Sequence, residues 1–178
     1  MSKTIRIAAL ALAASTGMAL ATQPPALTPD RVSDFKAAWG ESIVEIGAVY
    51  TAGGDYEAAA RNHILDFYAF GEDIVLFKPT LASDEQFRGT FDEAMSYFVG
   101  GDIAEDNGFA LAPYTDVRWD SEGISIIGDV ALTMGNYYFT TSDGEEVKVE
   151  YTFGIEQRED GDLTIVLHHS SLPFTPTS

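Results

Sequence analysis

The sequence predicts an α+β fold in which N-terminal helices pack on a strongly curved antiparallel β-sheet. Three observations predict it. Apolar residues recur at helical spacing between Val32 and Phe98, whereas the last third alternates β-branched and aromatic runs with hairpin turn signals. Gly135 and Gly154 lie inside two of these runs, where a bulge or bend can curve a sheet. Such a sheet wraps against helices as a cone whose mouth can hold one small ligand.

Each expected helix is preceded by a residue whose side chain caps a helix start, namely Thr28, Asp55 and Thr90. Thr90 and Glu93 form a capping box, in which each side chain satisfies a backbone donor of the other. Glycines follow the last apolar residue of each pattern. The expected helices therefore cover residues 29–52, 56–70 and 91–99.

Short runs rich in β-branched and aromatic residues predict the strands. They cover residues 74–77, 114–119, 124–127, 130–140, 147–155 and 163–171. Turn signals separate the later runs at residues 121–123, 128–129, 142–144 and 160–162. Pro79 ends the first strand and leaves Thr80 on the following loop.

The chain of 178 residues is long enough for one domain with a real core. We expect a signal peptide at residues 1–21, a flexible leader at 22–30 and a single cone-shaped domain at 31–174. The leader contains three prolines and has no periodicity. No cysteine is present, which excludes disulfides, thiolate nucleophiles and cysteine-ligated zinc.

The first residues have the pattern of an export signal. Lys3 and Arg6 precede a short apolar run at residues 7–14, and Ala19-Leu20-Ala21 is typical of a cleavage site. The run is too short to span a bilayer. The alternative is an N-terminal core helix, but the flanking residues favour export to the periplasm or to the outside of the cell.

The formal net charge is -18, and the acids are scattered along the chain rather than run together. This surface repels nucleic acid and anionic membranes, so we expect neither as a partner. An anionic ligand such as bicarbonate must therefore be bound by local hydrogen-bond donors.

The run His168-His169-Ser170-Ser171 ends the last expected strand and holds two of the three histidines. Because side chains alternate along a strand, His169 and Ser171 share one face with Leu167, and His168 and Ser170 share the other. An imidazole and a hydroxyl on one face make a plausible small-molecule site. The alternative is a buried polar patch that closes the cone.

A three-histidine zinc centre is not expected, because adjacent rings on a strand diverge. The sequence does not exclude a site in which carboxylates bind a hard cation, although no calcium-loop spacing is present. Binding of zinc, manganese or magnesium is likewise not excluded. We expect no cofactor.

Three blocks of the chain match a known family. They are Leu76-Phe77-Lys78-Pro79-Thr80, Met95 to Asp102, and the strand Met134 to Phe139 together with Val149 to Phe153 and the terminal His-His-Ser-Ser-Leu-Pro. With these blocks the chain resembles the iota-class carbonic anhydrases. That family has a cone-shaped fold akin to nuclear transport factor two and to the association domain of calmodulin-dependent kinase.

The resemblance implies reversible hydration of carbon dioxide to bicarbonate by a homodimer; some members of the family depend on a metal and others work without one, and we expect a metal-free site here. Many relatives place a further histidine at the position of Leu167, and its loss removes a possible metal ligand. The resemblance assigns catalysis to Thr80, Tyr97, His169 and Ser171. We further expect substrate-binding side chains at His168, Ser170, Tyr151 and Phe98. The alternatives are a non-catalytic periplasmic ligand-binding domain and an oligomerisation domain of the same fold.

Overall fold

The structure is a computed structural model that describes residues 24–176. The expected signal peptide, residues 1–21, lies outside the described residues. Within the described range, no helix combines the length and the apolar character that a membrane span requires. Residues 24–28 lead into the first helix, and the backbone oxygen of Pro25 accepts hydrogen bonds from Arg31 and Gln157.

Three α-helices precede most of the sheet, as the sequence predicts. They are α1 (Pro29–Thr51), α2 (Tyr56–Phe67) and α3 (Phe91–Val99), and a 3₁₀ turn follows at Phe109–Leu111. The caps are confirmed, because Thr28 and Asp55 accept backbone N–H groups of the first turns, and Thr90 and Glu93 form both bonds of a capping box. The caps fix where each helix starts and hence which face it buries.

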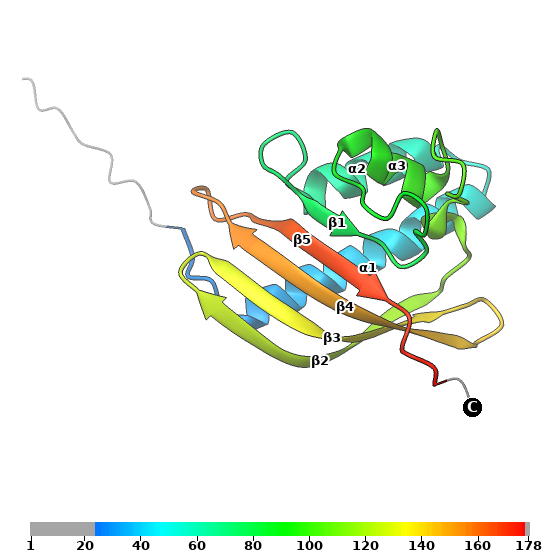
Figure 1. Ribbon diagram of the computed structural model, residues 1–178. Coiled ribbons are helices and arrows are strands. Elements are labelled where there is room, and N and C mark those ends of the chain that lie inside the picture. The colour runs from blue at the N-terminus through cyan, green and yellow to red at the C-terminus, as the bar shows by residue number, and fades with distance from the viewer. Residues whose placement is uncertain (1–23, 177–178) are drawn as a thin grey trace, which may run out of the picture.

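The sheet has five strands in the order β1-β5-β4-β3-β2 (Figure 1). The strands are β1 (Leu76–Lys78), β2 (Asp116–Ile127), β3 (Val130–Thr140), β4 (Glu146–Gln157) and β5 (Leu163–Ser171). All neighbours are antiparallel except β1, which pairs with β5 in parallel. The edge pair thus departs from the antiparallel sheet that the sequence predicts, while the α+β class is confirmed.

One expected turn is wrong. The residues 121–123 do not reverse the chain but form a bulge inside the long strand β2, opposite Gly135. A Cβ atom on Gly135 would lie 2.3 Å from the backbone oxygen of Asp120, so only glycine allows this close approach. A second bulge occurs at Gly154 in the β4–β5 pair. Both glycines therefore mark the places where the sheet bends, as expected.

The helices cover one face of the sheet, with α1 running across it and α2 and α3 gathered over its β1 end (Figure 1). Aromatic rings fill the space between the layers, and Trp39 of α1 packs edge-on against Phe153 of β4 and His168 of β5. The opposite face is open, and Leu132 and Met134 of β3 are exposed there. We call the covered face inner and the open face outer.

Candidate functional site

The two polar pairs at the end of β5 lie on opposite faces of the sheet. His168 and Ser170 are inner and each is 3% exposed, whereas His169 is exposed and Ser171 is half-buried on the outer face. The pairing of the four residues into two faces is therefore confirmed. The expectation that His169 and Ser171 point into the cone is wrong, because the inward pair is His168 and Ser170.

The bulge in the β4–β5 pair explains the reversal. Ile165 is fully buried, so uniform alternation from Ile165 would turn 167, 169 and 171 inward. In the structure Gly154 pairs with Leu167 and Ile155 pairs with Ile165, which leaves Val166 as an extra residue. This extra residue exchanges the faces of every side chain after it.

The inner pair meets Thr80, which the loop after β1 carries to the same point. Thr80 Oγ1 donates to Ser170 Oγ over 2.8 Å. The parallel β1–β5 pairing brings the two segments together, because Lys78 lies opposite His169 in register. The hydroxyl of Tyr137, from β3, lies near the side chains of Thr80 and Ser170, which oppose the rise that burial causes in its pKa. Three hydroxyls from three separate elements thus converge.

Tyr97 of α3 adds a fourth hydroxyl beside this group. It is 5% exposed, and its ring stacks on Phe109. Burial, together with the nearby Tyr137 hydroxyl, raises the pKa of Tyr97, so that it remains a neutral donor. We call Thr80, Tyr97, Tyr137 and Ser170 the inner hydroxyl cluster.

A cavity of about 210 Å³ opens beside Tyr97. Its lining includes Leu81, Phe109 and Tyr114 together with Glu105 and Asp106. Asp106 is neutralised by the buried side chain of Arg88, over 2.7 Å. The cavity therefore offers a small molecule a partly apolar approach to the Tyr97 end of the cluster.

His168 is enclosed by aromatic rings next to the cluster. Its ring centroid lies 4.4 Å from that of Phe153 and 4.9 Å from that of Phe77. Nδ1 is 2.9 Å from the Tyr68 hydroxyl, and Nε2 is 3.5 Å from the Tyr137 hydroxyl. Burial lowers the pKa of His168 well below its ordinary value, so the imidazole is neutral at neutral pH.

The structure does not bring the hydroxyl of Tyr151 into the cluster. That oxygen lies 2.7 Å from Ser121 Oγ and 3.0 Å from Nζ of the buried Lys36, towards β2. Phe98 is buried in the core, where its ring stacks on Phe77. Of the four residues expected around the substrate, His168 and Ser170 therefore meet the cluster, and Phe98 supports its apolar wall.

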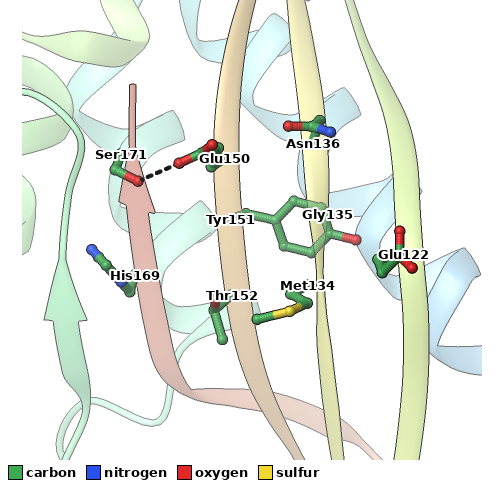
Figure 2. A pocket seen from close by; sticks show the side chains of 9 residues that line it. All are labelled: Glu122, Met134, Gly135, Asn136, Glu150, Tyr151, Thr152, His169 and Ser171. Carbon is green, nitrogen blue, oxygen red and sulfur yellow. Dashed lines mark hydrogen bonds between the residues drawn. The ribbon is translucent and has the colours of Figure 1, made fainter. Parts of the chain in front are cut away.

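The outer pair lines a shallow hollow of about 330 Å³ instead (Figure 2). Ser171 Oγ donates to Glu150 over 3.0 Å, and the carboxylate of Glu122 faces the same hollow. Two carboxylates disfavour an anion there. A larger groove of about 670 Å³, beside the edge strand β1, is mainly apolar and is lined by exposed Ile74, Leu76 and Phe87. Neither hollow gathers neutral hydrogen-bond donors as the inner cluster does.

The third histidine, His63 of α2, is buried in the core, and its Nδ1 lies 3.0 Å from Ser42 Oγ. Among residues 24–176, no three histidine, aspartate or glutamate side chains are arranged to hold a metal ion. His168 and His169 point to opposite faces, in agreement with the divergence expected from the strand.

Neither Tyr68 nor Tyr137 is among the site residues expected from the sequence. A tyrosine between apolar residues needs a partner for its hydroxyl when it is buried, and this signal is present for Tyr68, between Phe67 and Ala69. The partner itself could not be identified, because Tyr68 and His168 are 100 residues apart.

A family model described as metal-independent carbonic anhydrase matches residues 30–172. The chain is 42% identical to a metal-independent carbonic anhydrase of Nostoc sp. over 154 residues, which are 84% of this chain and 75% of the relative. The crystal structure of an iota-carbonic anhydrase from a cyanobacterium, complexed with bicarbonate, superposes with a TM-score of 0.84 at 37% identity, covering 89% of this chain and 100% of that one.

A protein of Xanthomonas campestris described as a calcium/calmodulin-dependent protein kinase II association domain has a similar fold. Its TM-score is 0.54 at 19% identity, with 87% of this chain and 98% of that chain covered. At this identity the likeness concerns the fold only.

Proposed function

The chain belongs to the family of metal-independent carbonic anhydrases, which interconvert carbon dioxide and bicarbonate, and we propose that it carries out this reaction at the inner hydroxyl cluster beside His168. The observation that carries the proposal is the 2.8 Å contact between Thr80 Oγ1 and Ser170 Oγ, on the inner face and next to a neutral imidazole. The bicarbonate-bound relative, at 37% identity, supports the same class of ligand.

In the hydration of carbon dioxide, a bond forms between the water oxygen and the carbon, one C=O bond becomes a C–O⁻, and one proton of the water is released to solvent. Neutral O–H groups that already point at this position stabilise the developing charge without having to reorganise. Thr80 and Ser170 can exchange their mutual hydrogen bond for bonds to substrate oxygens, and the nearby hydroxyl of Tyr137 can donate a further one. Burial strengthens such bonds, because the local dielectric is low.

The surrounding rings suit the other substrate, which is small and apolar. Phe77 and Phe109 pack edge-on and face-on against Tyr97, so carbon dioxide can be held against hydrocarbon next to the hydroxyls. Bicarbonate, once formed, meets the same donors but has a full charge in a chain of net charge -18. The negative surface therefore favours its release.

We propose that this chain needs no metal, in keeping with its family. Chelator-treated protein should hydrate carbon dioxide above the buffer blank in a stopped-flow pH assay, and added zinc, manganese or magnesium should not change the rate. No hydration with or without these ions would refute the proposed function. Activity only after a metal is added would refute its metal-free form.

Two further proposals concern the whole molecule. The positively charged start, the short apolar run and the Ala19-Leu20-Ala21 site support export to the periplasm or beyond. The outer sheet face, with Met134 53% and Leu132 42% exposed, supports a homodimer formed through the sheet. Detection of the precursor and mature forms in cell fractions, and light scattering of the purified protein, test these two points.

A further inference from the structure

A chain of buried hydrogen bonds enters the site from α1, on the side away from the hydroxyl cluster. The indole Nε1 of Trp39 donates to the Tyr68 hydroxyl over 3.1 Å, and both residues are 1% exposed. An indole N–H can only donate, so the Tyr68 oxygen is the acceptor in this contact. The Tyr68 proton is therefore left to be donated elsewhere.

The acceptor for that proton is Nδ1 of His168, at 2.9 Å. Among residues 24–176, the Tyr68 hydroxyl has two side-chain hydrogen-bond partners, Trp39 and His168. If Nδ1 carried a proton instead, the Tyr68 oxygen would accept twice and its own O–H would be buried without a partner. A buried polar group without a partner is strongly disfavoured. Nδ1 is thus an acceptor.

A neutral imidazole carries one proton, so the proton of His168 sits on Nε2. Nε2 lies 3.5 Å from the Tyr137 hydroxyl, which belongs to the inner hydroxyl cluster. When Tyr137 accepts from Nε2, its own O–H is free to point towards Thr80, Ser170 or a bound oxygen. The donor and the acceptor of each hydrogen bond in this series are then set by the indole N–H of Trp39, which can only donate.

We infer that Trp39 and Tyr68 are positioning residues that hold His168 as its Nε2–H tautomer, so that the ring serves the hydroxyl cluster as a hydrogen-bond donor and not as a base. The lone pair of the ring faces Tyr68 and is turned away from Ser170. The inference depends on the proposed function for its effect on the rate, but the tautomer is a property of the resting protein.

The tautomer can be read directly by ¹⁵N NMR of protein labelled at histidine. The chain has three histidines, and a His169→Gln variant together with a His63→Gln variant assigns the signals. We expect a protonated, pyrrole-type Nε2 and an unprotonated, pyridine-type Nδ1 for His168 at neutral pH. The reverse pattern, or two protonated nitrogens, overturns the inference. This measurement needs no activity, so an inactive protein would refute the proposed function and leave the tautomer still testable.

Tyr68→Phe tests the positioning role, with Tyr50→Phe as its control because Tyr50 is exposed on α1. We expect Tyr68→Phe to mix the two tautomers and to lower kcat by about tenfold with little change in KM, the scale on which loss of a histidine's orienting partner acts. Tyr50→Phe should change neither. An unchanged tautomer and an unchanged kcat in folded Tyr68→Phe overturn the positioning role.

A second pair of variants distinguishes the effect of losing the indole N–H of Trp39 from the effect of losing the volume of an indole ring. Trp39→Phe removes a hydrogen-bonded N–H, whereas Trp119→Phe removes an indole whose Nε1 is buried without a partner. The two rings pack against each other with centroids 5.8 Å apart, so both variants disturb the same layer. Only Trp39→Phe should alter the His168 signals. Equal changes in both variants would show that packing, and not the donated hydrogen bond, sets the tautomer.

Discussion

Thr80 Oγ1 lies 2.8 Å from Ser170 Oγ, although 90 residues separate the two along the chain. The contact exists because β1 is added in parallel to the free edge of β5, and because the chain leaves β1 through Pro79. Two hydroxyls that are hydrogen-bonded to each other in the ligand-free protein are close enough to contact the same ligand oxygen. This contact therefore links the topology of the sheet to the proposed chemistry.

Ser170 and Ser171 are adjacent hydroxyls on opposite faces, which makes them a matched pair. Ser170→Ala removes a donor of the inner hydroxyl cluster and should lower kcat for carbon dioxide hydration by about a hundredfold, the usual cost of losing one donor to a developing oxyanion. Ser171→Ala removes only an exposed bond to Glu150 and should leave the rate within about twofold of wild type. Stopped-flow assays of both variants decide the matter. A larger loss in Ser171→Ala would place the site on the outer face.

The two neighbouring histidines allow the same comparison for the ring. His168→Gln removes a buried imidazole that contacts Tyr68 and Tyr137, and we expect at least a tenfold loss of kcat/KM. His169→Gln changes an exposed side chain and should have little effect. Circular dichroism and thermal unfolding would establish that both variants fold. Comparable activity in the two would refute the assignment of His168.

Arg88 should matter for stability more than any exposed ion pair. Its side chain and that of Asp106 are both fully buried, and they are 2.7 Å apart. Arg88→Leu leaves the Asp106 carboxylate buried without a partner, which should cost about 3–5 kcal/mol in the free energy of unfolding. Arg118→Ala, which breaks an exposed pair with Glu146, should cost less than about 1 kcal/mol. Urea unfolding measures both values.

The double variant Arg88→Leu/Asp106→Leu provides the control for this prediction, because it removes both charges together. It should be more stable than Arg88→Leu alone. If the double variant is as unstable as the single one, the loss comes from packing and not from the uncompensated carboxylate.

Stability should fall as the pH drops below about 6.5, because two buried histidines resist protonation in the folded state. Burial lowers the pKa of His63 to about 3 and that of His168 well below its ordinary value. Below about pH 6.5 the unfolded chain binds protons that the folded chain excludes. The free energy of unfolding therefore falls by up to about 1.4 kcal/mol for each histidine per unit of decreasing pH.

The free energy of unfolding between pH 6.0 and 5.0, measured in urea, tests this effect before most carboxylates titrate. His63→Gln should reduce the slope of the free energy of unfolding against pH by the contribution of one histidine. A slope that is the same in wild type and His63→Gln would contradict a neutral, buried His63.

The elements of this fold could be predicted because their signals are local. The helix starts could be predicted because their capping side chains form hydrogen bonds within the first turn, at Thr28, Asp55 and Thr90. Gly135 and Gly154 announce the bends because a Cβ atom at either position would crowd the neighbouring strand. The resemblance to a known family added Thr80 and Tyr97, and the structure brings both to the inner face.

The inward face of β5 could not be predicted, because it depends on one extra residue in the pairing of β5 with β4. Val166 fits the alternating pattern of the sequence but drops out of the ladder opposite Gly154. The resemblance points to His169 and Ser171, one residue away from the inward pair, and counting along the strand does not reveal the difference. The contact of Tyr68 with His168 was also beyond reach, because no local pattern encodes a bond between residues so distant in the chain.

The most direct test of the account is a crystal structure of this protein grown with bicarbonate. We predict bicarbonate oxygens within hydrogen-bond distance of Thr80 and Ser170, beside the Tyr97 hydroxyl. Bicarbonate bound in the outer hollow, against His169 and Ser171, with the inner hydroxyl cluster still closed on itself, would contradict the account.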